Sequence, residues 1–125
     1  MLAMIQNLDL ECAKLAETLA QQMSEQVITK ALGVLEEQGL YAYFLFLKSS
    51  KEKEIKKEDK EEIINRCYSL LQDNLSLKNN SKDIFEKIQG LATDLDNLLL
   101  ARDLLRQALV YARYHAKAKE KEKST

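Results

Sequence analysis

The chain has 125 residues, of which 46% are hydrophobic and 31% charged, and its formal net charge is −1. This balance is typical of a soluble globular protein, and the length favours one domain with a substantial core. The chain has no proline and only three glycines, which argues against a β-rich fold with many tight turns. We therefore predict an all-α protein, a single domain over residues 1–125 built as a compact bundle of five or six helices with long first and last helices.

The two cysteines and the N-terminus indicate where such a protein would reside. Cys12 and Cys67 form neither a disulfide framework nor a CxxC pair, and their apolar neighbours predict two buried, reduced thiols. The N-terminus lacks the basic segment of a signal peptide, and no apolar run approaches the roughly 20 residues that cross a bilayer. We therefore expect a cytoplasmic protein with no membrane partner.

The first half of the chain has a helical pattern. From about Asn7 to Gln38, apolar residues recur at spacings of three and four, which predicts one amphipathic helix of about eight or nine turns. Gly39 stands where a C-terminal cap is expected. Residues 40–50, LYAYFLFLKSS, are rich in aromatics, but a lone strand among helices would have unpaired edges. We predict instead a short buried helix at the centre of the bundle.

The middle of the chain begins with a charged segment. Residues 48–58 are predicted to form a solvated loop, and Asp59 with Glu62 has the form of a capping box at the start of the next helix. Apolar residues from Ile63 to Leu71 then form one helical face. Residues 73–81 are predicted to be a connection.

Two further helices are predicted in the last third. Ser81 is a candidate N-cap for a short helix over residues 82–89, closed by Gly90. Thr93 is expected to cap the final helix, which runs from about residue 94 to 119 before a frayed tail at 120–125.

Charge is distributed unevenly along the chain. Residues 1–47 hold six acids and two lysines, whereas residues 101–125 hold seven cations and three anions, a net charge of +4. The near-neutral total therefore hides an acidic first third and a basic end, and such an asymmetry bears on partners rather than on fold.

The final helix aligns its cations. At 100° per residue, Arg102, Arg106, Arg113 and Lys117 fall within an arc of about 60°, which we expect to face outward, nearly opposite the core. Arginine forks hold phosphate oxygens in pairs, and a neighbouring tyrosine can stack on a base or bond to a phosphate. The predicted nucleic-acid-binding residues are Arg102, Arg106, Arg113, Tyr114, Lys117 and Lys121. A polar protein-binding surface, or a solvated face stabilised by the helix dipole, would show the same pattern.

Catalytic chemistry has little support in the sequence. The one histidine, His115, lies on the apolar side of the final helix, where we expect a core-edge residue bonded to a neighbour. One histidine and two distant cysteines do not make a zinc site, and no glycine-rich loop is available for phosphates. We expect no enzyme activity, metal, cofactor or small-molecule substrate.

Two stretches together resemble a known family. VLEEQGLYAYFLFLKS, residues 34–49, and LLLARDLLRQALVYARYHAKA, residues 98–118, resemble the small helical subunit of type III-B (Cmr-type) CRISPR effector complexes. The resemblance places Gly39, the run from Leu40 to Leu47, and the region from Arg113 to Ala116 at that family's helix end, hydrophobic helix and aromatic–basic cluster.

The resemblance implies a non-catalytic subunit of a ribonucleoprotein that acts in antiviral defence. Its implied partners are other CRISPR effector subunits, copies of itself in a stacked filament, and the duplex of guide RNA and target RNA. Because base pairing reads the sequence, a row of cations that contacts only the backbone would suffice. The alternative is a helical protein–protein adaptor that binds no nucleic acid, and an enzyme that uses His115 is the weakest reading.

Overall fold

The computed structural model describes the backbone of residues 2–75, 83–91 and 95–123, and the side chains of residues 8–75, 83–91 and 95–120. The described residues form six α-helices and no strand, so the predicted all-α bundle with long first and last helices is confirmed. The helices are α1 (Leu2–Gln22), α2 (Glu25–Gln38), α3 (Leu40–Ser49), α4 (Lys57–Asn74), α5 (Ile84–Leu91) and α6 (Leu95–Lys123).

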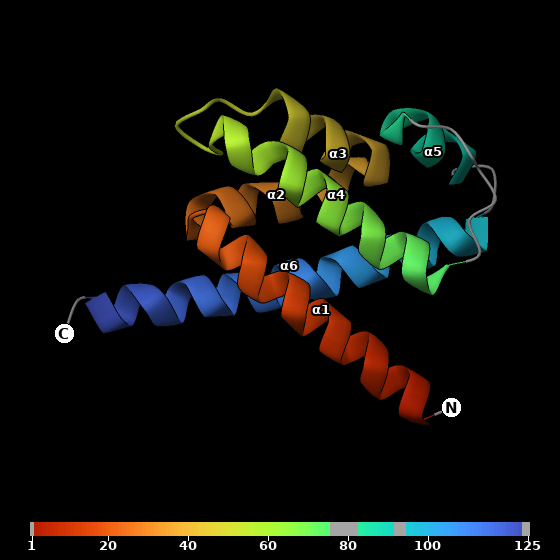
Figure 1. Cartoon of the computed structure of the whole chain (residues 1–125), viewed down its shortest axis with the longest axis horizontal. Helices are drawn as coiled ribbons and strands as arrows, with labels where there is room; N and C mark the ends of the chain where they lie inside the picture. The colour runs from red at the N-terminus through yellow and green to blue at the C-terminus, as the bar shows by residue number, and fades with distance from the viewer. Residues whose placement is uncertain (1, 76–82, 92–94, 124–125) are drawn as a thin grey trace.

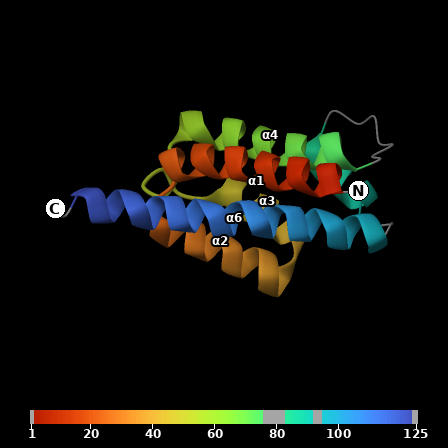
Figure 2. The ribbon, with the colours of Figure 1, turned by 90° about the horizontal axis from the view of Figure 1, so that it is seen from below.

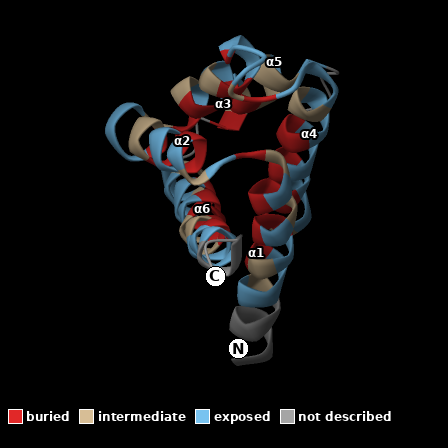
Figure 3. Ribbon diagram, turned by 90° about the vertical axis from the view of Figure 1, so that its left-hand side faces the viewer, coloured by how far each residue is buried: buried red, intermediate tan, exposed pale blue. Residues whose placement is uncertain are grey.

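The helices are arranged around one core (Figure 1). The most extensive helix–helix contact joins α1 to α6, and α2 packs on the other side of α6. Helix α4 packs on α1, while α3 contacts both α2 and α4 and so connects the two pairs. Figure 3 shows the buried residues facing the space between these pairs, with α5 against the outer side of α3. The C-terminal end of α6 extends past the start of α2 (Figure 1).

The predicted single helix over residues 7–38 was wrong, because the chain breaks into α1 and α2 at Ser24. Ser24 has extended backbone angles (φ −72°, ψ 163°), and its Oγ accepts a hydrogen bond from the Val27 amide at 3.2 Å, as an N-cap does. Met23 and Val27 on either side are both buried, so the apolar stripe continues across the break. The spacing of the apolar residues therefore did not reveal the break between α1 and α2.

Replacing Ser24 by alanine should lower the free energy of unfolding by about 1 kcal/mol, because the Val27 amide loses its acceptor. Urea denaturation followed by circular dichroism measures this change. Ser69→Ala is the matched control, since Ser69 is exposed within α4 and alanine favours helix there. An unchanged stability for Ser24→Ala would contradict the capping role.

Helix α3 confirms the short helix predicted for residues 40–50, but its predicted place at the centre of the bundle was wrong. Leu40, Tyr43, Phe44 and Leu47 are buried, whereas Tyr41 and Leu45 are exposed on the opposite side. The helix thus lies at the edge of the core with one apolar face covered. Gly39 caps α2 as predicted, donating its amide to the carbonyls of Leu35 at 3.1 Å and Val34 at 3.2 Å.

The charged connection is shorter than the predicted 48–58, because α3 runs to Ser49 and α4 begins at Lys57. The capping-box prediction was wrong: Lys56 is the N-cap residue, without a side-chain cap, and Asp59 lies in the first turn of α4. Ile55 is fully buried and anchors the connection. Glu54 is joined to Lys30 of α2 by an ion pair of 2.9 Å.

The boundaries of the last two helices also differ from expectation. Gly90 does not close α5, which continues to Leu91, and α6 remains helical to Lys123 rather than fraying at residue 120. The proposed caps Ser81 and Thr93 lie outside the described residues.

Candidate nucleic-acid interface

The cationic row of α6 reaches solvent, but along the seam with α2 instead of on the face opposite the core. Arg102, Arg106 and Lys117 are exposed, whereas Arg113 is half-buried. Arg106 Nε lies 2.8 Å from Glu36 Oε1, and Lys117 Nζ lies 3.8 Å from Glu25 Oε1. Both carboxylates belong to α2, which therefore runs antiparallel to α6 beneath the row.

Helical geometry explains the shift. Tyr111 is only half-buried, and the buried residues of α6 are Ala101, Leu104, Leu105, Ala108, Leu109, Ala112 and Ala116. The centre of this buried set lies about 110° from the centre of the cationic row, at 100° per residue. The row is therefore a flank of α6, and α2 occupies the neighbouring space. The face that points fully outward includes Tyr114, whose side chain is 67% exposed.

The two ion pairs lower the charge that the row offers to a polyanion without removing it. The neighbouring Glu36 raises the pKa of Arg106, chiefly through their hydrogen bond. Exposed pairs of this kind are weak because water and salt screen them, and a phosphate competes with the carboxylate for the same cation. Arg102 has no ion pair with any residue whose side chain the structure describes.

Arg113 differs from the other cations because part of its guanidinium is buried without a partner. Its Nε is inaccessible to solvent and has no hydrogen bond to the described part of the chain. Arg113, Val110, Tyr114 and Lys117 line a pocket of about 140 Å³ beside it. Because two cations, Arg113 and Lys117, line this pocket, it is suited to a small anion such as a phosphate.

A second cavity lies on the other side of Tyr114, between α1 and α6. Its volume is about 290 Å³, and its lining consists of Asp9, Ala13, Tyr111, Tyr114, His115 and Ala118. The Tyr111 hydroxyl donates a hydrogen bond to Asp9 Oδ1 at 2.5 Å, and this bond raises the pKa of Tyr111. The cavity is mostly apolar, with one carboxylate at its edge.

His115 is exposed, so its predicted core-edge position was wrong. Because α1 covers the neighbouring side of α6 only in part, His115 lies at the rim of this cavity, outside the core. Sequence reasoning missed Asp9 and Tyr111 as site residues. The spacing of Tyr111, Tyr114 and His115, which places them on one side of α6, could have indicated Tyr111 as a site residue. No sequence pattern connects the distant Asp9 to them.

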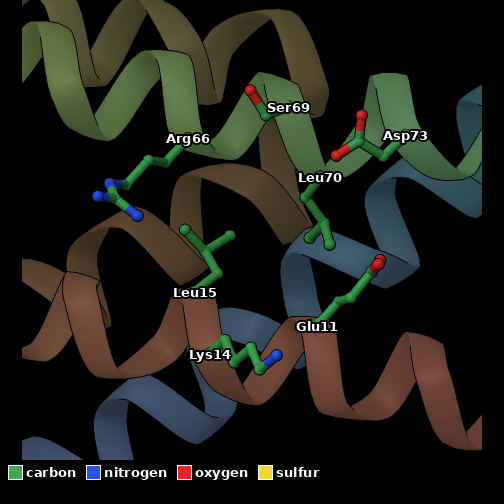
Figure 4. A pocket seen from close by; sticks show the side chains of 7 residues that line it. All are labelled: Glu11, Lys14, Leu15, Arg66, Ser69, Leu70 and Asp73. Carbon is green, nitrogen blue, oxygen red and sulfur yellow. The ribbon is translucent and has the colours of Figure 1, made fainter.

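A third pocket, of about 410 Å³, lies between α1 and α4 (Figure 4). Its lining places Lys14 and Arg66 near Glu11 and Asp73. Arg66 already binds Glu62 at 2.9 Å, and Glu11 accepts a hydrogen bond from Asn74 at 2.6 Å. The mixed charges give this pocket no preference for an anion.

The buried thiols are unsuited to reaction. Cys12 and Cys67 are free and buried, as predicted. Burial raises the pKa of Cys12 to about 11, with Asp9 and Glu11 adding to the effect, and raises that of Cys67 to about 12. Since the thiolate is the reactive form, both side chains behave as small apolar groups. The Cys67 sulfur lies 3.3 Å from the buried Tyr43 hydroxyl.

The side chains that the structure describes contain no group of three or more histidine, cysteine, aspartate or glutamate residues placed to hold a metal ion. No helix within the described ranges is long and apolar enough to cross a membrane. The side chain of Lys121, the sixth predicted binding residue, lies outside the described residues.

Comparisons with protein-family models, curated protein sequences and solved structures found no significant match for this chain. The site on α6 must therefore be interpreted from its own geometry.

Proposed function

We propose that the chain is a non-catalytic helical subunit of a ribonucleoprotein and contacts RNA phosphates through the C-terminal half of α6. The contact residues are Arg113, Tyr114 and Lys117, with Arg102 and Lys121 extending the surface along the helix. The sequence resemblance to small subunits of type III-B CRISPR complexes would make the assembly an RNA-guided effector in antiviral defence. In that setting copies of the chain stack beside the guide RNA.

The pocket that Arg113 and Lys117 line together carries this proposal. It also has the exposed Tyr114 in its lining, and Arg113 has no ion pair with a carboxylate of the described side chains. A phosphate between the two cations would accept hydrogen bonds from their accessible N–H groups, and the C-terminal end of α6, which extends past α2, would leave room for a long polyanion (Figure 1). A rigid helix holds the two cations in place for the RNA backbone, where they read no sequence, which suits an assembly in which base pairing selects the target.

Neutralising Arg113 should weaken RNA binding more than neutralising Arg106. Arg113→Gln removes an unpaired cation, whereas Arg106→Gln removes one already engaged by Glu36. Fluorescence anisotropy with a labelled single-stranded RNA, over a series of salt concentrations, measures both variants. We expect the slope of log affinity against log salt to become shallower by about 0.7 for Arg113→Gln and to change less for Arg106→Gln. Equal behaviour of both variants and the wild type would contradict the proposal.

A second candidate function, a protein–protein adaptor, is favoured by the exposed side of α3. Tyr41 and Leu45 lie one turn apart there, with the Phe85 ring 5.7 Å from the Tyr41 ring and Lys48 Nζ 5.5 Å from the Phe85 ring. The ratio of absorbance at 260 and 280 nm of the native assembly, recovered at low salt, separates the two functions. An assembly free of nucleic acid would favour the adaptor.

A further inference from the structure

We infer that the two cavities beside Tyr114 form one nucleotide site, which takes an unpaired nucleotide of a single-stranded RNA. The base would enter the apolar cavity between α1 and α6, and the adjoining phosphate would occupy the pocket of Arg113 and Lys117. This inference rests on the proposed function and specifies the form of RNA that the site binds.

Tyr114 is the wall that the two cavities share. It lines both of them, and it is the most exposed tyrosine of the described side chains. No neighbouring ring covers it among the described residues, so its aromatic surface is accessible to a ligand. The π-face of such a side chain is what single-stranded nucleic acids stack on.

The larger cavity has the chemistry of a base site. Ala13 and Ala118 provide small apolar walls that admit a flat ring, and Tyr111 provides a second aromatic side chain. Asp9 lies at the edge, where Oδ1 accepts the Tyr111 hydroxyl. A carboxylate has about four acceptor positions, so Asp9 keeps capacity for the N–H groups of a base.

The smaller pocket has the chemistry of a phosphate site. Arg113 and Lys117 are two cations in its lining, and their side chains carry several N–H donors. Glu25 competes for Lys117 only at 3.8 Å. An anion between these two cations would therefore meet one without a described carboxylate partner, Arg113, and one that is weakly engaged, Lys117.

Only an unpaired nucleotide can use both cavities. In a duplex the bases are stacked and paired, so a base would have to be taken out of the stack to reach the α1–α6 cavity. A duplex can present its phosphates to Arg113 and Lys117 alone. The combined site should therefore bind single-stranded RNA more tightly than duplex RNA. The cationic row by itself would not distinguish the two forms.

The test compares one RNA strand in two forms, a labelled oligoadenylate alone and the same strand annealed to oligouridylate. Anisotropy at low salt is measured for the wild type, Tyr114→Ala, Tyr114→Phe and the control Tyr41→Ala, an exposed tyrosine on α3. We expect Tyr114→Ala to lose about tenfold in affinity for the single strand and to keep its affinity for the duplex. Tyr114→Phe and Tyr41→Ala should bind as the wild type does.

Photocrosslinking gives a second readout that does not depend on affinity. The single strand should crosslink to peptides containing Tyr111 or Tyr114, and the duplex should not. If Tyr114→Ala weakens both forms equally, or neither, the nucleotide site is wrong while salt-dependent binding through Arg113 still upholds the proposed function. If the wild type binds neither form, both proposals fail.

Discussion

Replacing Phe44 by alanine should lower the free energy of unfolding by about 3–5 kcal/mol. The Phe44 side chain is fully buried on α3, and its ring meets that of Tyr43 edge-on, with 5.3 Å between the ring centroids. Truncation removes a large apolar group from water-free surroundings and leaves a cavity that close-packed neighbours fill only in part. Because the whole stability of a domain is about 5–15 kcal/mol, the variant should unfold at a much lower urea concentration.

Leu45→Ala is the matched control for this variant. Leu45 is the next residue on the same helix, and its side chain is 44% exposed. Since alanine favours helix at least as well as leucine and little buried surface is lost, the change in stability should be small. Comparable losses for the two variants would contradict the assignment of α3 as a helix with one buried and one exposed face.

Most of the secondary structure could be predicted because it depends on short-range patterns. The aromatic run over residues 40–50 was correctly assigned to a helix, because a single strand would have had no partner, and Gly39 was correctly placed as a cap. The break at Ser24 was missed for a physical reason. Its cap turns the chain without interrupting the apolar stripe, so hydrophobic periodicity stays the same on both sides.

The surroundings of the cationic row could not be predicted in the same way. Spacing alone places Arg106 and Lys117 on one flank of α6, but only the packing of α2 decides that Glu36 and Glu25 lie beside them. Asp9 reaches Tyr111 from a position 102 residues earlier in the chain. Long-range partners of this kind depend on how the helices pack, which no single helix encodes.

The ion pairs between α2 and α6 also explain how a nearly neutral chain can keep a basic end. The acidic first third is folded against the basic last helix, so Glu36 and Glu25 offset Arg106 and Lys117, the second and the last cation of the row. Arg102 and Arg113 have no ion pair with a carboxylate of the described side chains, and the C-terminal end of α6 extends past α2 (Figure 1). The charge that no carboxylate offsets therefore includes Arg113, next to the exposed Tyr114.

Gly39→Ala should destabilise the protein by about 1–3 kcal/mol, whereas Gly33→Ala should stabilise it by up to about 1 kcal/mol. A Cβ atom would meet no other atom within 4 Å at either position, so sterics with neighbours do not separate them. Gly39 has φ 100° and ψ −176°, a conformation almost restricted to glycine, whereas Gly33 lies inside α2 without a positive φ.

Gly39 cannot escape this conformation cheaply, because its backbone serves two helices. Its amide donates to the carbonyls that end α2, and its carbonyl accepts the Tyr43 amide of α3 at 3.1 Å. A change of φ at residue 39 would break one set of these hydrogen bonds. An alanine at this position would therefore keep the strained backbone conformation and its energetic cost. Urea denaturation of the two variants measures the changes, and the opposite signs are the diagnostic result. A stabilising Gly39→Ala would show that the turn between α2 and α3 adopts another backbone conformation.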